Sequence, residues 1–186
     1  MDPREQKIVD AAIEQFMRYG VRRTTMNDIA SSAGVVRQTL YNVYDSKEAV
    51  LRAAMRRLTD IAVAAVECET AGAATLGDKL DIAFEHFALR PYDQINASPD
   101  AEDVISGVMN VAMEEIAEGD RRYRVALEQI LKPRADAIRS SGMTVGALAD
   151  LVQTSVKAFK HKAHDRKHLE NLLASLKTMV LRVAGG

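Results

Sequence analysis

Cysteine, tryptophan, proline and glycine are all scarce in this chain of 186 residues, and each shortage narrows the class of protein. The single cysteine, Cys68, excludes a disulfide framework within the chain and fits a reducing compartment. Four prolines and ten glycines are too few for a disordered chain or a many-turned β protein. No apolar run approaches the ~20 residues that a membrane-spanning helix needs, and no signal-peptide pattern is present. These absences predict a cytoplasmic protein without a membrane partner.

The motifs that mark common enzyme classes are missing too. The sequence contains no glycine-rich phosphate loop, no GxSxG and no HExxH. Its one metal-like spacing is the cluster of His161, His164, Asp165 and His168. The apolar pattern changes phase between residues 162 and 166, so we interpret this cluster as a solvated turn. We therefore predict no catalytic residue, no cofactor and no metal ion.

Helix-forming residues in a helical pattern are what the sequence does contain. Alanine, leucine, methionine, glutamate and arginine dominate, and 47% of the residues are apolar. Apolar positions recur at helical spacing along the chain, which predicts an all-α fold of about nine helices. The expected helices cover residues 2–19, 25–33, 36–43, 46–69, 76–90, 98–118, 120–140, 144–160 and 167–184.

Two features of the middle of the chain lead to specific expectations. Residues 90–99 contain Pro91 and Pro99 and are expected to form the longest irregular connection. Residues 104–113 carry no charge, so the centre of the helix that follows is expected to be buried on all sides. Gly119 is expected to separate that helix from the next one, which Pro133 should bend.

The stretch from residue 24 to residue 47 carries the functional signal. Thr25 and Asp28 have capping-box spacing at the start of one short helix, and Gly34 stands where that helix must end. A second short helix follows at once, as in a helix-turn-helix. It is rich in hydrogen-bonding groups and poor in charge, which suits contacts with DNA base edges. An ordinary short helical hairpin is the alternative.

The charge distribution agrees with a DNA-binding N-terminus. Residues 1–58 contain ten Lys and Arg against seven Asp and Glu, which gives +3. The remaining residues contain fifteen against nineteen, which gives −4. A basic N-terminal part suits phosphate binding, although a random scatter of three charges would give the same number.

A set of residues in this region resembles the N-terminal signature of the tetracycline-repressor (TetR) family of bacterial transcription regulators. The matching positions are Phe16, Gly20, Thr24, Thr25, Ile29, Ala30, Ala33, Gly34, Val35, Thr39, Leu40, Tyr41, Ser46, Lys47 and Glu48. The resemblance covers roughly residues 5–55. Val36 and Val43 depart from it, because the family usually has a capping Ser at the first position and a phosphate-contacting Tyr or His at the second.

The resemblance implies a domain order and a partner. Residues 1–45 would be a three-helix helix-turn-helix domain, residues 46–69 a linking helix, and residues 70–186 a helical ligand-binding and dimerisation domain. The partner would be a palindromic double-stranded DNA operator. The residues expected to contact it are Thr25, Arg37, Gln38, Thr39, Tyr41, Asn42 and Lys47. Arg22 and Arg23 could contact phosphate or lie in a solvated turn.

The last two helices carry apolar stripes that allow two interpretations. They can pack with a twofold copy into a four-helix bundle, or they can cover the monomer's own core. The family resemblance favours a homodimer. The residues expected at its interface are Val152, Val156, Leu172, Leu176 and Val180.

The resemblance also implies a pocket for an unidentified small-molecule effector in the body. Candidate lining residues are Phe84, Phe87, Met109, Met113, Tyr123, Leu127, Ile130 and Phe159. Taken one at a time, each of them fits plain core better than a ligand contact. The sequence thus predicts a DNA-binding regulator, a repressor released by an apolar or amphipathic molecule. A helical enzyme and a dimeric interaction protein with weakened DNA binding are the alternatives.

Overall fold

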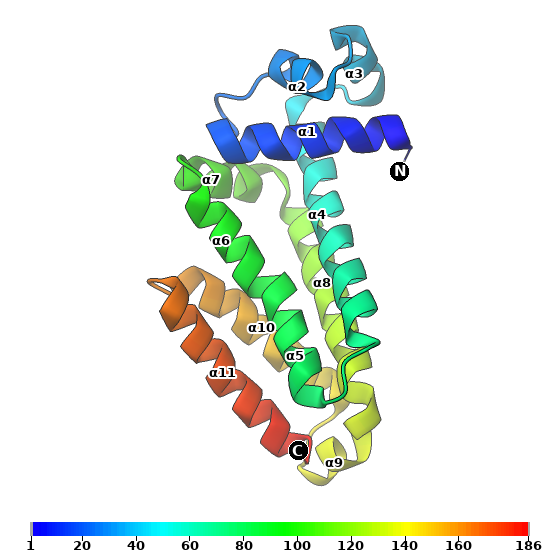
Figure 1. Ribbon diagram of the computed structural model, residues 1–186, viewed down its shortest axis with the longest axis vertical. Coiled ribbons are helices and arrows are strands. Elements are labelled where there is room, and N and C mark those ends of the chain that lie inside the picture. Colours follow the sequence, from blue (N-terminus) through cyan, green and yellow to red (C-terminus); the bar gives the residue numbers. More distant parts are fainter. Residues whose placement is uncertain (1, 186) are drawn as a thin grey trace. The chain divides into compact units, whose positions relative to one another are not determined.

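The computed structural model of the protein describes residues 2–185 and consists, over that range, of helices and their connections (Figure 1). Eleven α-helices are present in the described residues. Two of the junctions between them run through a π-helical or a 3-10 turn without leaving the helix. When these continuous helices are counted as one each, nine remain, so the predicted all-α fold of about nine helices is confirmed.

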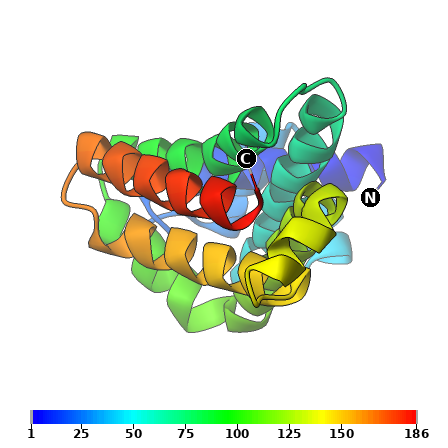
Figure 2. The same ribbon diagram turned by 90° about the horizontal axis from the view of Figure 1, so that it is seen from below.

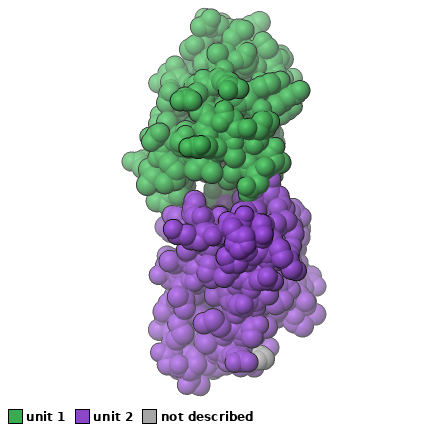
Figure 3. All heavy atoms as spheres, turned by 90° about the vertical axis from the view of Figure 1, so that its left-hand side faces the viewer, with its two compact units in different colours: residues 1–60, 94–118 green, residues 61–93, 119–186 purple. Residues whose placement is uncertain are grey.

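The helices divide between two compact units (Figure 3). Unit 1 contains the residues up to Asp60 together with Gln94–Glu118, and unit 2 contains Ile61–Asp93 together with the residues from Gly119 onward. This division follows packing, and the functional segments 1–45, 46–69 and 70–186 stay a prediction. Each unit has its own cluster of buried apolar side chains.

Unit 1 is built around the N-terminal helices. Its elements are α1(Pro3–Tyr19), α2(Met26–Ala33), α3(Arg37–Val43), the first part of α4(Lys47–Thr70), and α7(Ala101–Val111). The predicted end of the first helix is confirmed, because Gly20 has φ 83° and its N–H donates to the Phe16 carbonyl. Ile8, Val9 and Ile29 are fully buried where α1 and α2 meet, and each buried side chain stabilises the unit by ~1.5–3 kcal/mol.

Unit 2 is a bundle of longer helices. Its elements are the end of α4, α5(Leu76–Phe84), the π-helical η1(Glu85–Leu89), the start of α6(Arg90–Ala97), most of α8(Met113–Leu131), the 3-10 turn η2(Lys132–Arg134), α9(Ala135–Ser140), α10(Val145–Lys162) and α11(Arg166–Val183). Helices α10 and α11 lie side by side and antiparallel, and α11 also packs on α5 (Figures 1 and 2). The predicted turn between the last two helices is confirmed at residues 163–165.

The expected irregular connection at residues 90–99 is wrong, because α6 covers most of it. A proline inside an α-helix lacks an N–H and its ring collides with the carbonyl four residues earlier. Here the helix widens first: the Arg90 N–H donates to the Glu85 carbonyl, five residues back, in the π-helical turn η1. The wider turn directly before Pro91 accommodates its ring, and the helix continues.

The expected break at Gly119 is also wrong, because α8 runs through it. The chain bends instead at Ala112, which has φ −118° and ψ 33° between α7 and α8. Residues 104–113 are not buried on all sides either: Ile105, Met109 and Met113 are 41%, 44% and 55% exposed. Only the face that carries Val104 packs into unit 1, so a helix with no charge still has a solvated side. The bend at Pro133 is confirmed as the 3-10 turn η2.

None of the helices within residues 2–185 combines the length and the apolar character needed to cross a membrane.

Candidate DNA-binding site

Local hydrogen bonds fix the start and the end of α2. The Thr25 hydroxyl oxygen accepts from the Asp28 N–H at 3.2 Å, and an Asp28 carboxylate oxygen accepts from the Thr25 N–H at 2.9 Å and from its O–H at 2.7 Å. These bonds from Thr25 lower the pKa of the Asp28 carboxyl. Gly34, with φ 63°, ends the helix in the left-handed conformation. The predicted capping box and turn are confirmed. The Thr25 hydroxyl bonds to Asp28 within the capping box.

Helix α3 is fixed by one buried residue and presents its polar residues to solvent. Leu40 is fully buried in the core of unit 1, while Arg37, Gln38, Tyr41 and Asn42 are exposed and Thr39 is half-buried. Because Leu40 holds the inner face, the opposite face of α3 is available to a partner. This is the placement that a recognition helix needs.

The exposed side chains of α3 are paired one helical turn apart. The Arg37 guanidinium donates to the Tyr41 hydroxyl at 3.3 Å and lies 5.2 Å from the centre of its ring. The Gln38 amide donates to the Asn42 side-chain oxygen at 3.0 Å. Each pair limits side-chain freedom while the Asn42 amide N–H groups and further guanidinium N–H groups of Arg37 stay on the surface. Such groups recognise adenine and guanine edges respectively.

The two departures from the family signature lie at the two ends of α3. Val36 occupies the N-cap without a side-chain hydrogen bond and is 69% exposed, and Val43 is exposed in the last turn. The next residue, Tyr44, is buried and donates its hydroxyl proton to a Glu5 carboxylate oxygen at 2.8 Å. Burial, followed by the hydrogen bond and negative charge of Glu5, raises the pKa of Tyr44. Thus α3 is weakly held at its start and firmly held at its end.

Lys47 has an internal role in the structure. Its ammonium lies 2.7 Å from the Val21 carbonyl, 3.0 Å from that of Thr24 and 3.3 Å from that of Arg22. These three acceptors match the three donors of the ammonium group. Lys47 therefore ties the start of α4 to the turn between α1 and α2, and contact with a DNA phosphate stays a prediction.

An acidic segment, residues 94–118, compensates the basic residues of unit 1. It contains six acidic and no basic residues, so unit 1 as a whole holds fourteen acids against ten bases. Asp103 pairs with Arg22 at 3.1 Å, and Asp100 pairs with Arg23 at 3.9 Å. Residues 1–58 still carry +3, but unit 1 also contains residues 59, 60 and 94–118 and carries −4, whereas unit 2, with fifteen bases against twelve acids, carries +3.

Asp103 is the residue of this site that the sequence analysis missed. It is buried, with 7% of its surface exposed, and accepts a hydrogen bond from the Arg22 N–H at 2.8 Å. A buried carboxylate is costly to desolvate unless it is paired. The one available signal was an acidic residue directly before ten uncharged ones, and it does not reveal the partner 81 residues away.

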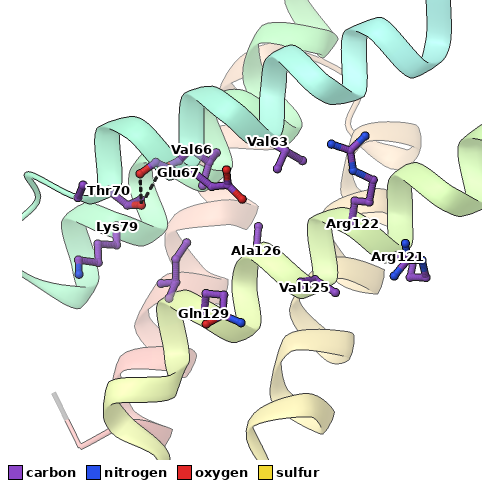
Figure 4. A pocket seen from close by; sticks show the side chains of 12 residues that line it. Val63, Val66, Glu67, Thr70, Lys79, Arg121, Arg122, Val125, Ala126 and Gln129 are labelled. Atoms are coloured by element: carbon purple, nitrogen blue, oxygen red, sulfur yellow. Dashed lines mark hydrogen bonds between the residues drawn. The ribbon is translucent and has the colours of Figure 1, made fainter. Parts of the chain in front are cut away.

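The predicted effector-pocket residues do not come together in one cavity. Phe84, Phe87 and Leu127 are buried in the core of unit 2, where the Phe87 and Tyr123 rings stack at 4.1 Å and the half-buried Phe159 packs on the same core. Met109 and Met113 are exposed and belong to unit 1. A groove between α4 and α8 in unit 2 is lined by a different set of residues (Figure 4). Ile130 is the one residue that this set shares with the predicted candidates.

The predicted interface residues are mostly internal. Val152, Val156, Leu176 and Val180 are 6% exposed or less and belong to the core cluster of unit 2, and Leu172 is half-buried. The alternative left open by the apolar pattern, that these stripes cover the monomer's own core, therefore holds for those four. The exposed large apolar residues of the same two helices are Leu151 and Met179.

The side chains considered for metal binding play other parts. Asp165 caps α11 by accepting from the His168 N–H at 2.7 Å, and the rings of His164 and His168 lie 4.2 Å apart. In the part of the chain that the structure describes, no group of three or more His, Cys, Asp or Glu residues is arranged to hold a metal ion. Cys68 is a free thiol on the exposed side of α4.

Comparisons with known proteins agree with the arrangement of α1 to α4. Residues 8–54 match the family model described as bacterial regulatory proteins, tetR family. The HTH-type transcriptional repressor KstR2 of Rhodococcus jostii is 37% identical over 57 residues, which cover 31% of this chain and 28% of that protein. A probable acrEF/envCD operon repressor of Escherichia coli K12 is 43% identical over 42 residues, which cover 23% of this chain and 19% of that protein. The chain thus matches under a third of the length of either relative.

Solved structures share the fold over the whole chain. The fatty acid degradation regulator FadR from Bacillus halodurans has a TM-score of 0.66 at 17% identity and covers 97% of this chain and 96% of its own. A TetR transcription regulator from Haloarcula marismortui has a TM-score of 0.71 at 15% identity and covers 94% and 95%. The chain therefore shares its helical fold with these structures. Its residues 8–54 match the signature of the tetR family of bacterial regulatory proteins.

Proposed function

We propose that the protein is a sequence-specific DNA-binding transcriptional regulator that reads its operator with α3. The observation that carries this proposal is the division of α3 into a buried anchor, Leu40, and an exposed face with Arg37, Gln38 and Asn42. Long polar side chains on a short helix after a tight turn suit the major groove. Residues 8–54 also match the family in which this arrangement defines the N-terminal domain.

A homodimer on a palindromic operator belongs to the same proposal. A helix of seven residues reads one half-site, and two half-sites lie about 34–36 Å apart or a multiple of that. An exposed stripe of small and apolar residues on α10 and α11 supports a twofold interface there. The stripe consists of the exposed residues Ala147, Leu151, Thr154 and Ala158 on α10 and Ser175 and Met179 on α11, together with the half-buried Leu172.

Repression relieved by a small molecule completes the proposal. Two of the similar proteins are named as repressors, which favours repression over activation. A groove on unit 2 offers a place for an effector. Such a regulator would work in the cytoplasm, where the operator lies.

Fluorescence anisotropy with labelled duplexes tests the proposal. The duplexes are the promoter regions beside the protein's own coding region and scrambled versions of them. We expect one promoter duplex to bind about 10³-fold more tightly than its scrambled version at fixed salt. Gln38→Ala combined with Asn42→Ala should abolish that preference.

Equal affinity for all duplexes would overturn the proposal. It would favour the second candidate function, a dimeric interaction protein with weakened DNA binding. The exposed valines at positions 36 and 43 are the observation that favours this alternative.

A further inference from the structure

Two ion pairs join α11 to α5 and α6 within unit 2. The Lys177 ammonium on α11 lies 2.8 Å and 2.7 Å from the two carboxylate oxygens of Asp81 on α5. At the start of α11, Arg166 Nε lies 3.0 Å from both carboxylate oxygens of Asp93 on α6. Helix α11 runs antiparallel to α5 (Figures 1 and 2), so the two pairs hold the helices together at two separate points along their length.

A groove of about 410 Å³ lies between these helices, and we call it the α5–α11 groove. It shares no lining residue with the groove between α4 and α8. Small-molecule sites have volumes of about 300–1,000 Å³, so a small organic molecule fits it. The residues on its two sides recur at helical spacing: Ile82, Glu85 and Leu89 on one side and Glu170, Leu173, Ala174 and Lys177 on the other. The π-helical η1 supplies Glu85 and Leu89, and π-helical turns are frequent at functional sites.

Half of the residues that line the α5–α11 groove are apolar. Phe84 and Leu173 are buried, Ile82 and Leu89 are half-buried, and Ala174 is exposed. Apolar surface in contact with water is unfavourable, and an apolar molecule that covers it removes that cost. The groove can therefore hold an apolar body of modest size.

The other half of the lining is charged, and these charges are paired within the protein. Each of the four carboxylates in the lining has a hydrogen-bonded partner. The pairs are Asp81 with Lys177, Glu85 with Arg90, Glu170 with Arg166 and Glu69 with His86. Lys177 is the fifth charged residue of the lining, and its partner Asp81 also belongs to the lining. The charged residues described in this lining therefore need no ion from outside.

This pairing excludes a charged ligand. An anion would face four carboxylates and would have to take Lys177 from Asp81. A cation would have to replace a partner that the protein already supplies, such as Arg90 at Glu85. A second copy of the chain would bring the same carboxylates against each other in a twofold contact. An uncharged small molecule avoids all three costs.

The carboxylates also select the polar group of the ligand. An ionised carboxylate accepts hydrogen bonds at about four positions and donates none. An O–H or N–H group of a ligand can thus bond to a carboxylate of the lining while the existing partner stays in place. We propose that the α5–α11 groove binds a small uncharged molecule with an apolar body and a hydrogen-bond donor, such as an alcohol, a phenol or an arylamine. This site does not depend on the proposed function.

Two fluorescent probes that share one aromatic body test the charge of the ligand. N-phenyl-1-naphthylamine is uncharged and has an N–H donor, and 8-anilinonaphthalene-1-sulfonate adds a sulfonate. We expect the full-length protein to bind the uncharged probe about tenfold more tightly, because the sulfonate would face the carboxylates. Glu85→Gln removes one carboxylate and releases Arg90, so it should tighten the sulfonate probe about tenfold and leave the uncharged probe within twofold. Asp136→Asn releases Arg139 in the same way on α9, outside the groove, and should change neither.

A pair of alanine variants tests where the uncharged probe binds. Ala174→Leu places a larger side chain in the α5–α11 groove and should weaken the uncharged probe about tenfold. Ala64→Leu adds the same atoms to the exposed face of α4 and should leave the affinity unchanged. Both alanines are exposed, so both variants should keep the helical content of the wild type.

Two competitors test the need for a donor. The compound 1-naphthol has an O–H group, and 1-methoxynaphthalene has the same ring system and oxygen without the donor. We expect 1-naphthol to displace the uncharged probe at about tenfold lower concentration, because a hydrogen bond to a charged acceptor is lost in the ether.

Three results would overturn the proposal: equal affinity for the two probes, equal affinity of Ala174→Leu and Ala64→Leu for the uncharged probe, or equal displacement by the two competitors. None of these measurements uses DNA. A protein that binds no operator would refute the proposed function and leave this site intact, and a protein that binds its operator but fails these tests would do the reverse.

Discussion

The carboxylate of Asp103 holds Arg22 at two points. One oxygen accepts from the Arg22 N–H at 2.8 Å, and the other lies 3.1 Å from the guanidinium Nε. The contact joins α7 to the turn between α1 and α2, directly before the helix-turn-helix. The same carboxylate needs the glycine at position 20, because a Cβ there would lie 2.5 Å from an Asp103 oxygen. The turn and the start of α7 are therefore matched to each other.

Loss of this carboxylate should destabilise the protein. We expect Asp103→Asn to lower the free energy of unfolding by about 1–3 kcal/mol, because a buried hydrogen bond from a backbone N–H to a charged acceptor is weakened. The ion pair adds little to this figure, since the Arg22 side chain is largely exposed. Urea unfolding measures the change. Glu102→Gln, an exposed neighbour on α7, is the control and should leave the midpoint unchanged; a matching loss there would assign the effect to net charge.

In unit 1, substitutions of residues that contact DNA bases should have different effects from substitutions of residues that hold the fold together. We expect Gln38→Ala and Asn42→Ala each to cost ~1–3 kcal/mol on the operator and little on scrambled DNA, because each side chain can make a bidentate base contact. Lys47→Met should lower stability, because three carbonyls lose their donor. Anisotropy titrations over a range of salt concentrations distinguish the two. If Lys47→Met lowers the slope of log affinity against log salt concentration by about 1, then Lys47 binds a phosphate after all.

The uncapped start of α3 suggests a variant that improves the protein. Val36→Ser should supply a side-chain acceptor for the first turn and tighten operator binding, in a helix too short to hold itself together. Little packing is lost, because Val36 is mostly exposed. Val36→Ala removes the side chain without adding an acceptor and serves as the control. Unchanged affinity in Val36→Ser would mean that packing through Leu40 already fixes the helix.

Tyr44 should make stability depend on pH in the alkaline range. Its pKa is raised above the ordinary value of 10.0 by burial and by Glu5, so the folded state retains the proton longer than the unfolded state. Stability from this residue is therefore complete below pH 10 and falls as the pH rises above it. Tyr44→Phe should remove that slope and lower stability at pH 7 through loss of the bond to Glu5. Urea unfolding between pH 7 and pH 11 tests this, and parallel curves for the two proteins would contradict it.

Local features were predictable from the sequence because their causes are local. The capping box of Thr25 and Asp28 and the left-handed Gly34 depend on residues within one turn of each other, and both are confirmed. The helix through Pro91 was not predictable, since a π-helical turn that depends on the surrounding bundle replaces the expected break. The position of the next helix break was not predictable either, because the chain bends at Ala112 and not at Gly119.

Long-range partners could not be predicted from one sequence. The family resemblance placed Lys47 among the operator contacts, yet its ammonium bonds carbonyls more than twenty residues away in the chain. The apolar stripe through Leu176 and Val180 identified a buried face but not what covers it. A hydrophobic pattern is the same whether the partner is the monomer's own core or a second copy, so only the burial of each side chain separates the two.

The exposed stripe on α10 and α11 leads to a prediction about assembly. Leu151 and Met179 are 48% and 61% exposed, and they are the large apolar residues of α10 and α11 that are exposed to solvent. A twofold contact would bury each residue twice, and a glutamate at either position would place a charge in that contact. We expect Leu151→Glu with Met179→Glu to give a folded monomer that loses operator binding. The inner face should behave differently, because Leu176→Glu puts a charge into the core of unit 2 and should unfold it.

Mass by light scattering, helical content by circular dichroism and operator affinity by anisotropy are measured together. Ala64→Glu with Cys68→Glu adds the same charge to the exposed face of α4 and should remain dimeric. A double variant on α10 and α11 that stays dimeric would show that the copies meet elsewhere. A monomer that keeps wild-type affinity for the full operator would contradict the requirement for two recognition helices at a fixed spacing.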